Sequence, residues 1–167
     1  EEGHQFDLVL TGRDTSKISQ TTASEENSYV AEINSLYRSL DDSYKERVKA
    51  PGFVSSDDLK RFYATCSAVV LPSSYEGFGL PYVEAVSYGS PIISSNIEPF
   101  QEQLRRYDYG DRSTICSQVE TSDWKAAMQA SLEKPLSPLT KDQIEAKLSL
   151  WSWDSAANRY LELMQMQ

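Results

Sequence analysis

The stretch from residue 72 to residue 91 constrains the fold more than any other part of the sequence. It follows a short, β-branched apolar run, Ala68–Leu71, which predicts a buried strand. Gly77 and Gly79 then permit a tight turn with close approach of a ligand, because glycine has no Cβ. Pro81 suits the first position of a helix, where its missing N–H costs nothing. The stretch therefore predicts a strand, a glycine-rich turn, a helix and a second strand.

The start of that helix, near Leu80, is expected to face the sheet edge at which open α/β domains bind anions. Two carboxylates belong to the same unit, Glu76 before the turn and Glu84 eight residues later. We predict that Glu84 lies in the first helical turn and leans back toward the loop of Glu76. A glutamate there also stabilises the helix dipole, which is a purely structural interpretation. Gly89 is expected to end the helix in a left-handed conformation.

The remaining chain alternates short apolar strands with amphipathic helices. We predict strands at residues 6–10, 47–50, 91–95 and 113–116, and helices at residues 28–40, 100–106 and 122–133 and after Ser55, Thr140 and Ser152. Residues 15–27 and 51–54 are expected to be loops. This alternation indicates an α/β fold with a doubly wound parallel sheet.

The length, charge and composition of the chain argue against several classes of function. The 167 residues suffice for one domain, and the net charge of −9 argues against nucleic acid and against anionic bilayers. No apolar run is long enough to span a membrane, and Cys66 and Cys116 lack metal-ligand spacing. We expect reduced thiols and a cytoplasmic location, either in solution or peripherally at the inner face of a membrane. The first residue is Glu1, so we expect a piece of a longer protein.

Several separated segments together resemble one family. They are Leu8–Gly12, Pro51–Val54, the unit from Glu76 to Glu84, Ser95–Asn96 and Ser152–Asp154. In this order they resemble the C-terminal, donor-binding domain of the retaining GT-B glycosyltransferases, family 4 (group 1). The resemblance implies a single Rossmann-like domain over residues 1–167. It also implies a nucleotide sugar as co-substrate, a separate N-terminal acceptor domain as partner, and a place in glycan or surface polysaccharide synthesis.

The resemblance also implies roles for individual residues. Glu84 would accept hydrogen bonds from both ribose hydroxyls, and Glu76 would face the donor sugar as the catalytic residue. Donor-binding backbone would come from the glycine turn, from the loop that reads the base, and from the end of the first strand: Gly77, Phe78, Gly79, Leu80; Gly52, Phe53, Val54; and Gly12, Arg13. Because front-face attack lets the leaving phosphate take the acceptor proton, neither a metal nor another cofactor is expected.

The chain departs from the family at its beginning. The resemblance implies another strand–helix unit, with an arginine and a lysine for the diphosphate, before the strand at Leu8; Arg13 and Lys17 imitate this pair only superficially. We therefore assign the Leu8 strand to the second position in the family's sheet and expect the first unit to be lacking. Such a sheet would expose an edge that another segment or a second copy could cover, unless the protein has reorganised its sheet. We expect the piece alone to be inactive.

Other interpretations stay open. The chain could be a non-catalytic glycosyltransferase-like binding module or a sugar-nucleotide epimerase on the same fold. A glycoside hydrolase fits poorly, because its two carboxyls must flank one bond. For Tyr75 and Phe78 we expect packing rather than ligand contact, and for Trp151 and Trp153 anchoring of the last helix. Arg13 is equally interpretable as an ordinary surface arginine.

Overall fold

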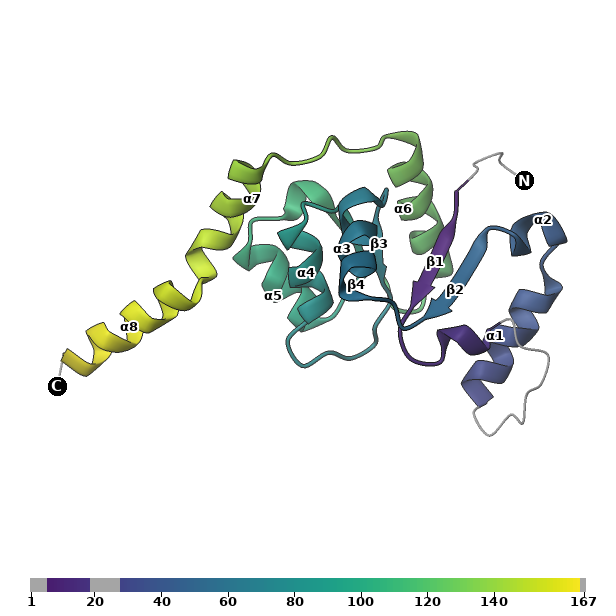
Figure 1. Cartoon of the computed structure of the whole chain (residues 1–167), viewed down its shortest axis with the longest axis horizontal. Helices are drawn as coiled ribbons and strands as arrows, with labels where there is room; N and C mark the ends of the chain where they lie inside the picture. The colour runs from purple at the N-terminus through teal and green to yellow at the C-terminus, as the bar shows by residue number, and fades with distance from the viewer. Residues whose placement is uncertain (1–5, 19–27, 166–167) are drawn as a thin grey trace. The chain divides into compact units, whose positions relative to one another are not determined.

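The computed structural model describes residues 6–18 and 28–165 (Figure 1). These residues fall into two compact units, residues 1–59 and 60–167, and each is described by itself. The helix α3 (Ser56–Thr65) runs across the boundary.

The first unit contains a two-stranded parallel sheet of β1 (Leu8–Thr11) and β2 (Val48–Gly52). Leu8 pairs with Val48 and Thr11 with Gly52, with a register shift between them. The helical elements between the strands are η1 (Thr15–Lys17), α1 (Ser28–Ser39) and α2 (Asp42–Lys45).

Two loop predictions in this unit need correction. Pro51 and Gly52 belong to β2, because the strand continues until Gly12 donates its N–H to the Gly52 carbonyl at 2.9 Å. Residues 15–17 form the 3-10 helix η1 rather than open loop, since the N–H groups of Lys17 and Ile18 bond back to Asp14 and Thr15. Residues 19–27 lie outside the described residues.

The second unit is built on a three-stranded parallel sheet with the order β3–β4–β5. The strands are β3 (Val69–Leu71), β4 (Ile92–Ser95) and β5 (Ser113–Cys116). The helical elements are α4 (Leu80–Ser87), α5 (Glu98–Arg106), η2 (Gly110–Arg112), α6 (Thr121–Glu133), α7 (Lys141–Leu148), η3 (Ser149–Trp151) and α8 (Trp153–Gln165).

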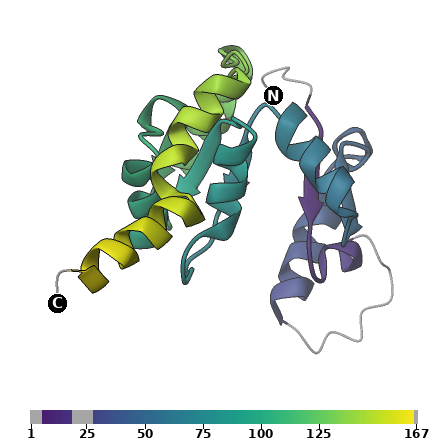
Figure 2. The ribbon, with the colours of Figure 1, turned by 60° about the vertical axis from the view of Figure 1, so that its left-hand side comes forward.

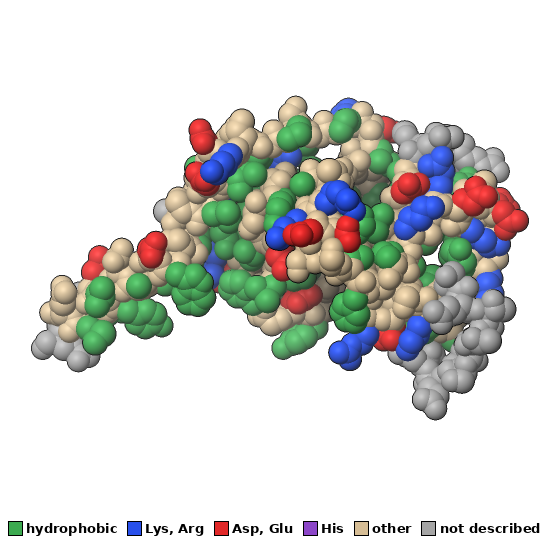
Figure 3. Space-filling view, in the orientation of Figure 1, with side chains coloured by type: hydrophobic (Ala, Val, Ile, Leu, Met, Phe, Trp, Pro, Cys, Tyr) green, Lys and Arg blue, Asp and Glu red, His purple; other side chains and the backbone are tan. Residues whose placement is uncertain are grey.

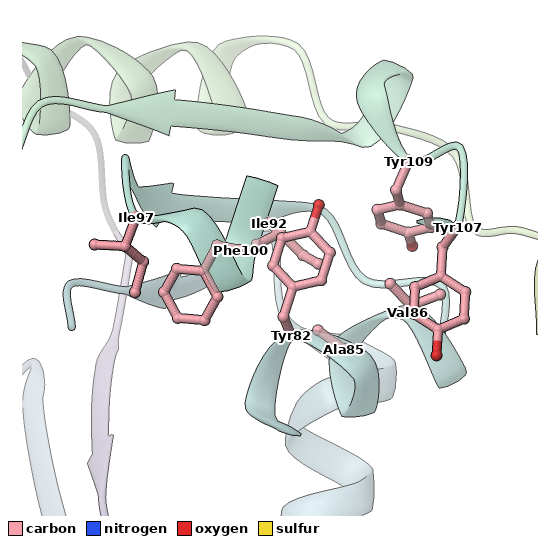
Figure 4. Close-up of a cluster of buried hydrophobic side chains, with 8 residues drawn as sticks. All are labelled: Tyr82, Ala85, Val86, Ile92, Ile97, Phe100, Tyr107 and Tyr109. Atoms are coloured by element: carbon pink, nitrogen blue, oxygen red, sulfur yellow. The ribbon is translucent and has the colours of Figure 1, made fainter. Parts of the chain in front are cut away.

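Successive residues of β4 point into different hydrophobic clusters, so both faces of this sheet are covered. Ile92 belongs to the larger cluster, in which the rings of Tyr82 and Phe100 stack with centroids 5.9 Å apart (Figure 4). Ile93 belongs to a smaller cluster with Ala127 of α6. This alternation confirms the predicted α/β, Rossmann-like fold with helices on both faces.

The described strands pair into two parallel sheets. Among the described strands, β1 pairs only with β2, and β3 pairs only with β4. The assignment of β1 to the second position of the family's sheet stays a prediction. The central run 68–71 is half-buried rather than buried, because β3 is an edge strand within its own sheet.

Several helix ends follow their sequence signals. Thr140 and Gln143 form the predicted capping box at α7, and Ser152 accepts the N–H of Ser155 at the start of α8. The helix α6 begins at Thr121, one residue before its predicted start. Near this end, the Asp123 carboxylate accepts the Ser117 N–H at 3.3 Å.

The helical run of α7, η3 and α8 closes the described chain (Figures 1 and 2). All residues of α8 are exposed, and hydrophobic side chains lie along its surface (Figure 3). Trp153 is 91% exposed, so the prediction that it anchors this helix is wrong. Trp151 does anchor, because its indole Nε1 donates to the Arg106 carbonyl at 3.0 Å.

Candidate functional site

The loop after β3 is attached at the carboxyl edge of the second unit's sheet. Ser95, the last residue of β4, donates its hydroxyl to the carbonyls of Leu71, at 3.4 Å, and Ser73. Gln118, just after β5, donates Nε2 to the Ser74 carbonyl at 3.3 Å. The neighbouring strand ends therefore hold the first residues of the loop that carries the glycine turn.

Glu76 is fixed from within this loop. Its Oε1 accepts a hydrogen bond from the Ser73 hydroxyl at 2.9 Å, and the residue is half-buried. Since Ser73 is itself held by Ser95, the carboxylate is connected to the end of β4 by two hydrogen bonds. Hydrogen bonds to an ionised acceptor are stronger than neutral ones, so this connection limits the carboxylate's rotation.

Glu84 lies in the second turn of α4, not the first as predicted, because the helix begins at Leu80. The macrodipole acts mainly over the first turn, so the helix-dipole interpretation loses its basis. The Glu84 side chain is held from another helix: its Oε2 accepts the hydroxyl of Tyr63 in α3 at 2.9 Å. Burial, followed by that bond to Glu84, raises the pKa of Tyr63, which therefore remains a protonated donor.

The glycine turn has a left-handed residue at its end. Gly79, the N-cap of α4, has φ 84°, and a Cβ placed there would lie 3.1 Å from Cδ1 of the buried Phe100 ring. The turn is also held by Gln103, whose Nε2 donates to the Phe78 carbonyl at 2.8 Å. Gln103 is completely buried, and its Oε1 has no partner among the described residues. The glycine turn therefore lies directly on α5.

This geometry leaves donors available at the start of α4. Within the part of the chain that the structure describes, the backbone N–H groups of residues 77–80 donate no hydrogen bond to protein. Unsatisfied N–H groups at a helix N-terminus form a ready site for an anion such as a phosphate. Glu76 and Glu84 stand in the chain on either side of this row of donors.

Aromatic residues around the turn have different environments. The Arg106 guanidinium lies 5.8 Å from the ring centroid of Phe78 and 3.8 Å from that of Trp151. Phe78 is 45% exposed, so its packing rather than ligand contact stays a prediction. Tyr75 is 85% exposed, so the prediction of packing is wrong for it. Arg106 therefore connects the turn to η3.

The first unit places its own candidate residues near one another. Gly12 (φ 113°) and Gly52 (φ 78°) are joined by a backbone hydrogen bond at the ends of β1 and β2, which are parallel. Phe53 and Arg13 beside them are exposed, and Val54 is half-buried. That these residues share a site with Glu76–Leu80 stays a prediction, because they belong to the other unit.

Among residues 6–18 and 28–165, no group of three or more His, Cys, Asp or Glu side chains is arranged to hold a metal ion. Over the same residues, no helix combines the length and the apolar character needed to cross a bilayer. The thiols of Cys66 and Cys116 do not form a disulfide, and burial raises the pKa of each thiol.

Three residues that position the site were missed by sequence reasoning. No role was predicted for Tyr63 or Gln103, and Ser95 was considered only as a strand end and as part of the family-like segment Ser95–Asn96. For Gln103 a signal existed: it lies three residues after Phe100, on the same face of a short helix, where a buried amide needs a hydrogen-bond partner. The hydroxyl of Tyr63 left no such local signal, because its partner is 21 residues away.

The fold is that of an α/β domain of the GT-B glycosyltransferase type. The chain matches the family described as "Glycosyl transferases group 1" over residues 5–148, and it belongs to that family. The solved structure of sucrose-phosphate synthase from Thermosynechococcus elongatus shares the fold, with a TM-score of 0.68 and 23% identity over 96% of this chain and 38% of that one. The predicted resemblance to the C-terminal domain of a GT-B enzyme is thus confirmed.

Two of the curated relatives are mannosyltransferases of Escherichia coli. O-antigen chain mannosyltransferase B of Escherichia coli is 47% identical over 82 residues, which cover 49% of this chain and 20% of that protein. Serotype-specific mannosyltransferase WbdA of Escherichia coli is 30% identical over 112 residues, which cover 66% of this chain and 13% of the relative. The chain therefore spans about a fifth or less of the length of these two relatives.

Proposed function

We propose that this chain is the donor-binding domain of a retaining, family 4 glycosyltransferase that uses a nucleoside-diphosphate sugar. The observation that carries the proposal is the row of backbone N–H groups at residues 77–80, which have no partner among the described residues and are bounded in the chain by two anchored carboxylates. A diphosphate would accept from these N–H groups, and the carboxylates would accept from hydroxyls on both sides of it.

The two carboxylates have different roles in this proposal. Glu84 accepts hydrogen bonds from the ribose hydroxyls in the ground state and in the transition state alike. Glu76 faces the sugar hydroxyls, orients the ring and stabilises the positive charge that develops at the anomeric carbon. The leaving phosphate takes the proton of the attacking acceptor hydroxyl, so the reaction uses no enzyme nucleophile and no metal.

The relatives narrow the donor and the pathway. Because one relative is named an O-antigen chain mannosyltransferase and another a serotype-specific mannosyltransferase, we propose a nucleoside-diphosphate mannose as the first donor to test and surface polysaccharide synthesis as the process. The acceptor would bind a separate N-terminal domain, which supplies the rest of the active site. The base would be read by the backbone of Gly52, Phe53 and Val54, with Gly12 and Arg13 bordering the same site.

The test separates binding from turnover in the full natural chain. Glu84→Ala should lower the affinity for the bare nucleoside diphosphate by one to a few factors of ten, because each hydrogen bond to a charged group contributes about 1.5–3 kcal/mol. Glu76→Ala should leave that affinity nearly unchanged and lower kcat with the nucleotide sugar. Calorimetry with UDP, GDP and ADP and steady-state rates with their sugars measure the two quantities.

Glu145→Ala is the charge-matched control, since Glu145 is an exposed glutamate of α7 whose carboxylate lies 3.5 Å from the Lys141 ammonium. It should change neither quantity. An equal loss of nucleotide affinity in the Glu76 and Glu84 variants would contradict the division of roles. A wild-type chain that binds a sugar nucleotide but never transfers the sugar would favour the non-catalytic binding module.

A further inference from the structure

Glu84 is hydrogen-bonded across helices by a residue to which the proposed chemistry assigns no role. The hydroxyl of Tyr63, in α3, donates to Oε2 of Glu84, in α4, at 2.9 Å. Glu84 is exposed, and an exposed glutamate ordinarily samples several rotamers. A donor fixed to another element would remove that freedom before any ligand arrives.

Tyr63 is itself firmly placed. Its ring stacks on that of Tyr88 with centroids 5.7 Å apart and planes 4° from parallel. Its backbone carbonyl accepts the hydroxyl of buried Ser90 at 2.6 Å. The side chain also packs against the larger hydrophobic cluster of the second unit. The position of its hydroxyl is therefore set by the core rather than by the surface loop.

The hydrogen bond leaves acceptor capacity on Glu84. A carboxylate has about four lone-pair sites on its two oxygens, and Tyr63 occupies one of them. Within the described chain, Oε1 of Glu84 accepts no hydrogen bond. One oxygen is thus held by the protein, and the other is available to a ligand. The phenol stays protonated at neutral pH, because burial and the nearby carboxylate raise the pKa of Tyr63.

We propose that Tyr63 is a positioning residue that orients the Glu84 carboxylate toward the two ribose hydroxyls of the nucleotide. This inference rests on the proposed role of Glu84. Tyr63 does not touch the nucleotide; it fixes the carboxylate plane so that Oε1 and the remaining site on Oε2 meet the neighbouring 2′ and 3′ hydroxyls together. Its effect is therefore confined to ligands that carry these hydroxyls.

The experiment uses Tyr63→Phe, which removes only the hydroxyl and keeps the stacked ring. Of UDP, GDP and ADP, the one that binds the full natural chain best is compared with its 2′,3′-dideoxy form by calorimetry. Tyr63→Phe should weaken binding of the ribonucleotide about 3- to 10-fold, the effect of losing one net hydrogen bond. It should leave binding of the dideoxy form unchanged. KM for the nucleotide sugar should rise while kcat stays near that of the wild type.

Tyr88→Phe is the matched control, because it removes a hydroxyl from the other ring of the same stack without touching Glu84. It should bind both nucleotides like the wild type. Tyr63→Phe combined with Glu84→Ala should bind like Glu84→Ala alone, since Tyr63 acts only through that carboxylate. Melting temperatures without ligand identify any general loss of folding in each variant.

Two failures can be distinguished. If the wild type and Glu84→Ala bind the ribo and dideoxy forms with the same preference, then Glu84 does not hold the ribose and the proposed role of Glu84 fails. If Glu84→Ala abolishes the preference but Tyr63→Phe retains it fully, the proposed role of Glu84 stands and the inference about Tyr63 is overturned. Equal weakening of both nucleotides by Tyr63→Phe would likewise overturn it, in favour of a purely structural tyrosine.

Discussion

Replacing Gly79 by alanine tests whether the glycine turn depends on backbone freedom and on contact with α5. Gly79 has φ 84°, a conformation that costs an L-residue about 1–2 kcal/mol. The new Cβ would lie 3.1 Å from Cδ1 and 3.2 Å from Cε1 of Phe100. That ring is fully buried and stacks on Tyr82, so it has little room to move. Overpacking of this kind costs about 1–3 kcal/mol.

The two costs add, and alanine offsets about 0.4–1 kcal/mol of this destabilisation because it restricts the conformations of the unfolded chain. The free energy of unfolding should therefore fall by about 2–4 kcal/mol. For a chain of this size, that lowers the melting temperature by roughly 5–15 °C. Urea titration should show a lower midpoint with an unchanged m-value, because the native fold persists.

Gly77→Ala is the control within the same turn. Gly77 does not have a positive φ, and nothing lies within 4 Å of a Cβ placed there. Its unfolding free energy should stay within about 1 kcal/mol of the wild type, on the side of slight stabilisation. If the Gly77 and Gly79 variants unfold at the same urea concentration, the turn's shape does not depend on its left-handed residue and the reasoning is refuted.

Two other predictions concern the buried polar groups of the second unit. Burial raises the pKa of Tyr82 and of Tyr109 to about 12, so their contribution to the free energy of unfolding is complete below pH 10 and is lost as pH rises through 12. Unfolding titrations at increasing pH should show this loss of stability, and Tyr82→Phe should make it smaller. A free energy of unfolding that stays constant between pH 10 and pH 12 would contradict the prediction. Gln103→Met should change the unfolding free energy by less than about 1.5 kcal/mol, since it removes both a hydrogen bond and an unpartnered oxygen. It should nevertheless accelerate chymotrypsin cleavage after Phe78, and equal acceleration at every cleavage site would argue against a local role.

Local sequence signals predicted the elements whose causes are local. The run Ser113–Cys116 is a strand with those bounds, Gly89 has the expected left-handed φ of 69°, and Thr140 caps its helix as the pattern predicts. Each of these depends on the residue itself or on neighbours within one helical turn. The parallel α/β class was predictable for the same reason, since it follows from the alternation of such elements.

Most of the wrong predictions concern residues whose structure depends on contacts, or on missing contacts, with distant parts of the chain. Pro51 belongs to a strand because β1 continues the pairing on that side, which no turn rule includes. Trp153 is apolar and lies in an amphipathic helix, yet it is exposed along with every other residue of α8. Glu84 lies in the second helical turn rather than the first because α4 begins at Leu80, one residue before the proline from which its start was predicted.

The candidate site shows why its motif predicts chemistry better than geometry. The motif supplies the carboxylates and the glycine turn, but their positions are set by Ser95, Gln103 and Tyr63, which lie outside it. Ser95 lies in a strand and donates to a backbone carbonyl. Gln103 lies in α5 and donates to the Phe78 carbonyl, and Tyr63 lies in α3 and donates to the Glu84 carboxylate. A ligand that contacts the loop, the glycine turn and the Glu84 carboxylate together would bind less tightly if any one of these elements shifted. We therefore expect variants of the three supporting residues to change nucleotide affinity while the motif itself remains intact, as positioning residues should.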